Sequence, residues 1–486
     1  MQYKWTVLSN TTVGTLMSSL DSNIVIIALP TIAKELPGTS VFVLLWILIG
    51  YALLTSVVLL NFGRLGDMFG RVRLYVLGFA IFTVGSALCG FSQTGTELIL
   101  FRMVQAVGAG FLFANAAAII TDAFAPNERG RALGINQVSI VAGSVAGLVL
   151  GGVLTSELGW RSIFFVNVPI GIVATWRAHV GMHELHRPQR EQRIDWLGNL
   201  SFAAGLSAIL LGVTLEALGQ LPGAAFWLLV AAGLALLVLF LWIERRVIHP
   251  MFDLTLLRIR MFSASISAIF LNAMARGAFS FVMVFFLQGP PHYLSPLTAG
   301  LYLIPVSASL AVIGPISGTL SDRYGSRPFA VLGLLVSAGG FVWLTQIGAS
   351  TTFFQLVGPF ILVGLGMGLF ASPNRASMMS SVPPERRGVA AGIGTTLLNS
   401  GVTLSLGLAI FVMASAVPLG ALTSIFLGTA HATATPAAVG RFIDATHSVF
   451  ALSAILLLVA LIPAAMRGPE NRSRPPGQPE RRTAVA

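Results

Sequence analysis

The sequence has few charged residues and almost no cysteine. Asp, Glu, Lys and Arg make up 10% of its 486 residues, against roughly 25% in an ordinary soluble domain. Hydrophobic residues make up 55%, and this balance excludes a soluble globular protein. The apolar runs are continuous, whereas the strands of a transmembrane β-barrel alternate in short segments. Helices are the remaining way to satisfy the backbone in lipid, so we predict an all-α polytopic membrane protein.

Other absences exclude classes of chemistry. The single cysteine, Cys89, excludes a disulfide framework and a thiolate metal site. There is no GxxxxGK[ST] phosphate loop, which excludes ATP-driven pumping, and no grouping of His, Ser and Asp supports an enzyme. We therefore expect no enzymatic activity, no cofactor and no metal. The net charge is +11, but the arginines lie in short clusters between apolar runs, which indicates membrane topology and no nucleic-acid partner.

Fourteen apolar runs are long enough to cross a bilayer. They lie near 13–33, 43–62, 74–91, 98–120, 133–154, 162–180, 196–215, 223–243, 262–287, 296–320, 329–347, 353–373, 388–414 and 447–466. If the N-terminus is cytoplasmic, nearly all loop arginines lie inside, and the outside segments hold only Lys34, Arg161 and Arg441. Positive charge marks cytoplasmic loops, so we predict a multi-pass protein of the cell membrane with both termini in the cytoplasm. The first run is expected to be a retained span and not a cleaved signal.

The chain contains an internal repeat. The segment GRLGDMFGRVRL from Gly63 recurs as GTLSDRYGSRPF from Gly318, and APNERGRALG from Ala125 recurs as PPERRGVAAG from Pro383. Two repeats at nearly the same offset predict two related halves of six spans, a common basis of alternating access in transporters. We therefore expect halves at 1–180 and 261–466, a linker at 181–260 that carries two inserted helices, and a disordered cytoplasmic tail at 467–486.

Four motifs resemble the major facilitator superfamily, in particular its fourteen-helix branch of drug:proton antiporters. The segment from Gly63 resembles the family's loop between the second and third spans, and LILFRMVQAVGAG resembles its fourth-span arginine motif. LDSNIVIIALPTI resembles the first-span signature of this branch. The fifth span follows the antiporter signature in its glycines, although Leu148 replaces the usual proline. The resemblance implies two pseudo-symmetric six-helix halves, a working monomer, and efflux of drug-like molecules driven by the proton gradient.

The repeated loop is expected to form a cytoplasmic latch between the halves. A tight turn between helices requires glycine where the backbone bends, and a carboxylate can pair bidentately with an arginine. The alternative is a set of solvated charges that serve only topology. The predicted latch consists of Gly63, Asp67, Gly70, Arg71, Asp122, Arg129 and Asp322.

The fifth span has glycines at helical spacing. Gly143, Gly147 and Gly151 lie four residues apart, hence on one face, and small residues let helix backbones approach closely. With Gly134 and Gly152 they are the predicted antiporter packing residues, and the resemblance suggests that this packing limits leakage and favours antiport. Simple helix packing is the alternative interpretation.

Two ionisable residues lie deep in the first and fourth spans. Asp21 lies roughly 12 Å inside the first run at 1.5 Å per residue, where desolvation disfavours the charged carboxylate. Arg102 stays charged and requires a partner or water. Such residues are functional candidates by default, so we predict that Asp21 exchanges a proton for substrate and that Arg102 tunes it. A static buried pair is the alternative.

A further set of polar residues could face the substrate. Arg276 lies deep in the ninth run, with Asn272 on the same helical face, and a cation in a cavity would favour anionic or amphipathic substrates. It could equally be an internal ion-pair partner, and interhelical hydrogen bonds are the alternative role for the amides. The candidate cavity residues are Asn115, Asn136, Gln137, Asn272, Arg276, Gln288 and Asn399.

These observations favour a proton-coupled exporter of hydrophobic or amphipathic small molecules. Its expected partners are the substrate, protons and the lipid bilayer. Lipid export, uptake or facilitated diffusion of a nutrient, and a non-transporting membrane receptor remain as alternatives at this stage.

Overall fold

The computed structural model describes residues 3–125, 128–185, 195–247, 250–383, 386–428 and 435–467. Within these ranges the regular structure is entirely helical, and fourteen helical segments are long and apolar enough to cross a membrane. The prediction of an all-α polytopic membrane protein with fourteen spans is confirmed. The predicted disordered tail lies outside the described residues, apart from Arg467.

The N-terminal half contains six spans. The first five are single helices, and the sixth is divided at Val166, where the short α6 meets α7. The elements are α1 (Tyr3–Glu35), α2 (Val41–Phe69), α3 (Arg71–Phe91), α4 (Gly95–Ala123), α5 (Arg129–Leu158), α6 (Ser162–Phe165) and α7 (Asn167–Gly181).

The inserted pair and the C-terminal half follow. The ninth and tenth spans are each built from two consecutive helices. The elements are α8 (Trp196–Ala217), α9 (Gly223–Glu244), η1 (Leu254–Arg258), α10 (Arg260–Arg276), α11 (Phe279–Gln288), α12 (Pro296–Tyr302), α13 (Ile304–Tyr324), α14 (Ser326–Leu344), α15 (Phe353–Ser380), α16 (Arg387–Ala416), α17 (Leu419–Phe426) and α19 (Pro436–Ala465).

The repeated turn is shorter than the sequence suggested. Gly63 and Asp67 lie within the last turns of α2, so they do not form a loop. The turn is made at Gly70 alone, at φ +110° and ψ +124°, a conformation that residues with a Cβ rarely adopt. Gly325 makes the same turn between α13 and α14 at φ +88° and ψ +153°. The internal repeat is therefore visible in the backbone.

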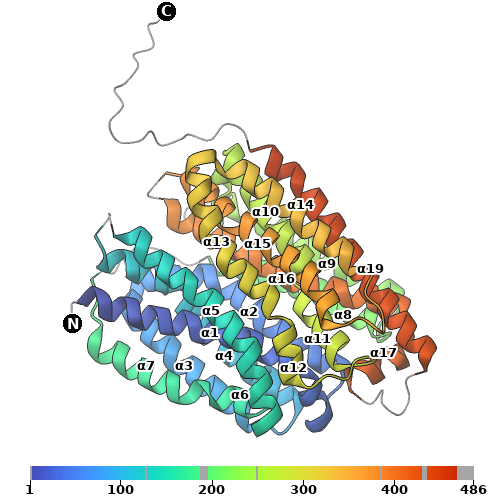
Figure 1. Ribbon diagram of the computed structural model, residues 1–486. Coiled ribbons are helices and arrows are strands. Elements are labelled where there is room, and N and C mark those ends of the chain that lie inside the picture. Colours follow the sequence, from blue (N-terminus) through green and yellow to red (C-terminus); the bar gives the residue numbers. More distant parts are fainter. Residues whose placement is uncertain are drawn as a thin grey trace, which may run out of the picture.

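The two halves form two groups of helices that lie side by side, blue to green and yellow to red in Figure 1. We call the end of the bundle that carries Tyr3 of α1 and Phe69 of α2 the inner end, and the opposite end, with Glu35, the outer end. The inserted pair α8 and α9 packs together, and α8 contacts both α2 and α16. Since α2 and α16 also contact each other, the pair lies beside a seam between the halves.

At the outer end the halves pack closely. A Cβ on Gly152 of α5 would lie 2.6 Å from the Cα of Leu297, and a Cβ on Gly300 of α12 would meet the carbonyl of Leu148. Nearby, the Gln288 amide donates to the Ile27 carbonyl of α1 over 2.9 Å. A residual space of about 10 Å³ remains between α1 and α11. The outer contact between the halves is therefore closed.

Candidate functional site

A buried ion pair lies within the N-terminal half. Asp21 of α1 is fully buried and Arg102 of α4 is 1% exposed. Arg102 Nη1 lies 2.5 Å from Asp21 Oδ2. Charges removed from water require a partner, and here α1 and α4 each supply one charge of the pair. The structure thus brings together the two residues predicted to take part in proton coupling.

Two amides complete the surroundings of the carboxylate. Gln105 Nε2 donates to Asp21 Oδ1 over 2.8 Å, and Asn167 Nδ2 donates to the same oxygen over 3.0 Å. Gln105 Oε1 in turn accepts from Arg102 Nη1 over 2.6 Å. The carboxylate therefore receives hydrogen bonds from α4 and α7 as well as the guanidinium charge.

Tyr51 of α2 closes the other side of the guanidinium. Its ring centroid lies 4.0 Å from Arg102 Cζ, a favourable cation–π distance. In the described part of the chain, Arg102 Nε, Asn167 Oδ1 and the Tyr51 hydroxyl have no hydrogen-bond partner. These three polar atoms of the cluster are therefore not used by the ion pair or by another described hydrogen bond.

The sequence identified three of the five residues of this cluster. Asp21 and Arg102 stand out as charges in apolar runs, and Gln105 belongs to the fourth-span motif. Asn167 and Tyr51 were missed, because one amide and one tyrosine give no signal that they face a carboxylate on another helix. Asp21 is paired with Arg102 and accepts two further hydrogen bonds from amides.

A second charged cluster lies at the inner end. Arg71 Nε donates to Asp67 Oδ1 over 2.8 Å, and Arg71 Nη1 lies 2.8 Å from both oxygens of Asp122. Glu184, which follows α7, accepts from the backbone N–H groups of Arg71 over 2.6 Å and Val72 over 3.1 Å. A carboxylate at a helix N-terminus is favoured by the helix dipole, so Glu184 anchors the start of α3.

This cluster joins α2, α3 and α4 within one half, and it does not include every residue of the predicted latch. Arg129 donates through Nε to the carbonyl of Phe124. Asp322 is exposed and forms no ion pair with any residue that the structure describes. The described contacts of the cluster therefore do not bridge the halves. Arg64 of α2 contacts the linker, because its Nη2 donates a hydrogen bond to the carbonyl of Pro250 over 2.7 Å.

The glycine face of α5 packs against α1. A Cβ on Gly143 or Gly147 would lie 2.5 Å from the carbonyl oxygen of Leu16 or Leu20, and one on Gly151 would lie 2.9 Å from Ile24 Cγ1. Gly152 differs, because it faces α12 of the other half. A Cβ on Gly134 would meet nothing within 4 Å, so this glycine is not used for packing.

Three of the amides predicted to face a cavity, Asn115, Asn136 and Gln288, are buried in the structure. Asn136 donates to Thr15 Oγ1 of α1 over 2.7 Å, and Asn115 donates to the carbonyl of Phe111 within α4. Gln288 is used in the outer contact described above. Asn136 and Gln288 form hydrogen bonds between helices, which is the alternative role of the amides, whereas the Asn115 bond lies within α4. Asn399 of α16 is half-buried.

Two candidates, Gln137 and Arg276, lie at exposed or half-exposed positions. Gln137 of α5 is exposed and accepts a hydrogen bond of 2.8 Å from Arg375 of α15, which joins the halves. Arg276 donates through Nε to Asn272 Oδ1 over 3.1 Å. Arg375 was missed because the twelfth apolar run ends at 373, whereas α15 continues to Ser380.

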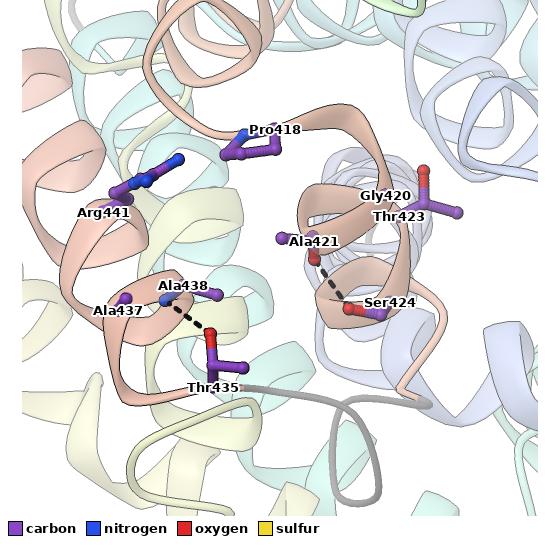
Figure 2. A pocket seen from close by; sticks show the side chains of 9 residues that line it. All are labelled: Pro418, Gly420, Ala421, Thr423, Ser424, Thr435, Ala437, Ala438 and Arg441. Carbon is purple, nitrogen blue, oxygen red and sulfur yellow. Dashed lines mark hydrogen bonds between the residues drawn. The ribbon is translucent and has the colours of Figure 1, made fainter.

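One pocket lies away from these residues. It has a volume of about 550 Å³ and lies between α17 and the start of α19, lined by residues that include Pro418, Thr435 and Arg441. Figure 2 shows these side chains around it. None of the predicted site residues lines this pocket, so it is separate from both charged clusters.

Comparison with known proteins identifies the family. The sequence profile of the Major Facilitator Superfamily matches residues 11–195, 187–406 and 265–486. The chain is 33% identical over 417 residues to the riboflavin transporter RibZ of Clostridioides difficile, covering 85% of this chain and 88% of that protein. It is 32% identical over 397 residues to the multidrug resistance protein Stp of Mycobacterium tuberculosis, covering 81% and 73%.

Solved structures show the same fold. An auto-inhibited peptide transporter of the POT family matches with a TM-score of 0.65 at 16% identity, over 95% of this chain and 96% of that one. At this identity the likeness concerns the fold alone. The family match spans nearly the whole chain and the relatives cover most of it. The chain belongs to the Major Facilitator Superfamily and is a multi-pass membrane transporter related to the superfamily's multidrug efflux proteins.

Proposed function

We propose that this transporter exports hydrophobic or amphipathic small molecules in exchange for protons, by alternating access between its two halves. The observation that carries the proposal is the buried Asp21–Arg102 pair, a titratable group held in the membrane interior of one half. The relationship to the multidrug resistance protein Stp supports export. In this proposal the inner end faces the cytoplasm, and the protein works as a monomer in the cell membrane.

Protonation of Asp21 would change the energetics of the cluster. The neutral acid no longer balances Arg102, and an uncompensated guanidinium in a low-dielectric site is strongly disfavoured. The conformation that gives Arg102 water or another partner is then stabilised. Loss of the proton restores the pair, so the two protonation states favour different arrangements of α1 and α4.

The packing of α1 offers a route from this cluster to the outer contact. Asp21 lies on the helix that packs against Gly143, Gly147 and Gly151 of α5. The adjacent Gly152 of α5 packs against α12 of the other half. Because backbones in such close contact move together, a shift of α1 is transmitted to the contact that closes the outer end.

The proton gradient supplies enough free energy for export. One charge moving across 100 mV releases about 2.3 kcal/mol, and about 1.4 kcal/mol corresponds to a factor of ten. The potential alone therefore supports roughly a fifty-fold gradient when one proton exchanges for a neutral substrate.

The test compares Asp21→Asn with wild type in proteoliposomes that carry a pH gradient. Pyrenebutanol, a neutral amphipathic dye, serves as the transported probe. We expect Asp21→Asn to lose accumulation driven by the pH gradient while it retains dye–dye exchange, since the amide preserves shape but binds no proton. Asp322→Asn, at an exposed position in the other half, is the matched control. Undiminished pH-driven accumulation by Asp21→Asn would overturn the proposal.

A nutrient-uptake function is the second candidate, because RibZ is named a riboflavin transporter. The same liposomes distinguish the two functions. Downhill flux of riboflavin that is unaffected by the pH gradient and by Asp21→Asn would favour uptake or facilitated diffusion. Flux that requires the gradient would favour proton exchange.

A further inference from the structure

We propose that the substrates are amphipathic anions, small apolar molecules with one acidic group, recognised by Arg276 and Arg375 of the C-terminal half. The proposal deepens the export function above and rests on it for the direction of movement. It concerns substrate charge, which neither the family nor the named relatives define for this chain.

The placement of Arg375 at the junction of the halves is defined by its neighbour. Asn374 is fully buried and donates to the carbonyl of Ser265 over 3.1 Å, which joins α15 to α10. The next residue, Arg375, points to the other half, where Nη1 donates to Gln137 Oε1 over 2.8 Å. Both Arg375 and Gln137 are exposed, so a guanidinium is accessible where the inner parts of the two halves meet.

Arg276 lies at the middle of the ninth span. It ends α10, where α11 begins three residues later, and it is only half-buried. A charged side chain at this depth is costly if it faces lipid and is normally found facing a water-filled path or the bundle interior. α10 contacts α15, α16 and α19 of its own half, and α11, which continues the span, contacts α1 of the other half. From this placement we infer that the exposed part of Arg276 faces the space between the halves.

An amide accompanies the deeper arginine. Asn272 is 4% exposed and its Oδ1 accepts from Arg276 Nε over 3.1 Å. Its Nδ2 has no hydrogen-bond partner in the described chain. This bond orients the guanidinium and leaves its two Nη groups, together with the Asn272 amide, as a set of donors without an acceptor among the residues that the structure describes. Guanidinium presents such donors in the geometry that suits a carboxylate.

The charge balance at this surface is positive. The ion pairs between described residues use Arg71, Arg102, Arg386 and Lys4 as cations, and neither Arg276 nor Arg375 takes part in one. Asp21, the acid buried in the membrane interior, already pairs with Arg102. A surface with two unbalanced guanidinium groups attracts anions and repels cations.

The two arginines lie at different depths. Asn374, next to Arg375, is level with Ser265, and Arg276 follows Ser265 by eleven residues along α10. At 1.5 Å per residue the separation along the helix is roughly 16 Å. An acidic group entering from the inner end would meet Arg375 first and Arg276 at the midplane, while the apolar body lies against the helices.

The test measures binding to the purified transporter in phosphatidylcholine nanodiscs without a pH gradient. The probes are pyrenebutanoate, pyrenebutanol and pyrenebutyl-trimethylammonium, which share one apolar body and differ in charge. We expect wild type to bind the carboxylate at least tenfold more tightly than the ammonium probe, with the alcohol between them. Equal affinities, or tighter binding of the ammonium, would overturn the proposal.

Variants assign the preference to the two arginines. Arg276→Gln should weaken carboxylate binding about tenfold and alcohol binding less than twofold, and Arg375→Gln should have a smaller effect in the same direction. Arg276→Lys keeps the charge and should retain most of the preference, which controls for misfolding. Arg327→Gln, at an exposed position of α14, should leave all three affinities unchanged. An undiminished carboxylate preference in the double variant Arg276→Gln/Arg375→Gln would overturn the assignment.

Charge movement separates this inference from the export proposal. Exchange of one carboxylate for one entering proton moves two charges, whereas exchange of a monocation for one proton moves none. Currents from proteoliposomes should therefore be large with the carboxylate and absent with the ammonium probe. Selective binding of the carboxylate without a proton-dependent current would contradict the proposed proton exchange. It would not contradict the preference for anions.

Discussion

The two halves share a fold and a repeated turn, but they hold their internal charges differently. In the N-terminal half Asp21 and Arg102 neutralise each other, and two amides complete the site. In the C-terminal half Arg276 and Arg375 form no ion pair with the described residues, and their partners are neutral amides. The comparison suggests a division of work, in which one half responds to protons and the other recognises the charge of the substrate.

The same contrast holds at one repeated helix position. Gly147 of α5 corresponds to Ser405 of α16 in the repeat. Gly147 lets the backbones of α5 and α1 approach closely, whereas Ser405 Oγ accepts from the N–H of Ala278 over 2.9 Å, at the break between α10 and α11. One half uses the position for close packing, and the other uses it to satisfy a backbone donor where a helix is interrupted.

The largest expected effect on stability distinguishes Arg102, which pairs with a buried carboxylate, from Arg276, which does not pair with a described carboxylate. Arg102→Gln leaves the buried Asp21 carboxylate unbalanced and should lower the free energy of unfolding by about 3–5 kcal/mol. Arg276→Gln should cost less than about 1 kcal/mol, because no buried carboxylate loses its partner. Thermal unfolding in detergent, followed by tryptophan fluorescence, measures both.

A double variant sharpens this comparison. Asp21→Asn/Arg102→Gln removes both charges and should recover most of the stability that Arg102→Gln loses, since replacing a whole buried pair is often nearly neutral. Similar losses for Arg102→Gln and Arg276→Gln would show that the two halves do not differ in this way.

The next effect concerns the close packing of α5 on α1. A Cβ on Gly147 would lie 2.5 Å from a backbone oxygen, so Gly147→Leu forces the helices apart and should cost about 3 kcal/mol. Gly134→Leu lies on the same helix, where a Cβ meets nothing within 4 Å, and should be close to neutral. Unfolding midpoints of the two variants test the difference, and equal midpoints would argue against glycine packing.

A smaller effect is expected at the repeated turns. Gly70→Ala and Gly325→Ala place a Cβ at positive φ, which should cost about 1–3 kcal/mol each. Gly63→Ala lies within helix α2 with open space around it and should be neutral or slightly stabilising. If Gly325→Ala were neutral while Gly70→Ala was destabilising, the two turns would not contribute equally to stability. That result would contradict the similarity of the two halves.

The smallest effect separates the two repeated aspartates. Asp67 pairs with Arg71 over 2.7 Å at a partly exposed position, so Asp67→Asn should cost about 0.5 kcal/mol, with a decreasing effect as salt rises. Asp322→Asn should have no measurable effect on stability. Chemical denaturation at low and high salt measures both, and a salt-sensitive loss at Asp322 would contradict the asymmetry.

Much of the architecture could be read from the sequence because it depends on local composition. The fourteen apolar runs and the turn at Gly70 gave correct predictions. The ends of the helices were less well placed, because α1, α2 and α15 continue beyond their apolar runs into polar segments. For this reason Arg375 was missed and Gly63 and Asp67 were assigned to a loop.

The site could be predicted only as a set of unusual residues. A charged residue in an apolar run can be recognised from the sequence alone, so Asp21, Arg102 and Arg276 were predicted. Asn167 and Tyr51, which contact the ion pair, were not found, because they resemble many other residues in apolar runs. Asn136, which donates to Thr15 of α1, shows that the sequence does not distinguish a polar residue at a helix contact from one in a cavity.

The sequence by itself determined that this chain crosses the membrane fourteen times and repeats one half in the other, because hydropathy and the steric freedom of glycine act over a few neighbouring residues. Only the tertiary structure decided which buried charges are neutralised. Arg102 meets Asp21 through the packing of α4 and α1, whereas the packing around α10 and α15 gives Arg276 and Arg375 amides and no carboxylate. Electrostatic pairing depends on distance in space, which the order of residues along the chain does not specify.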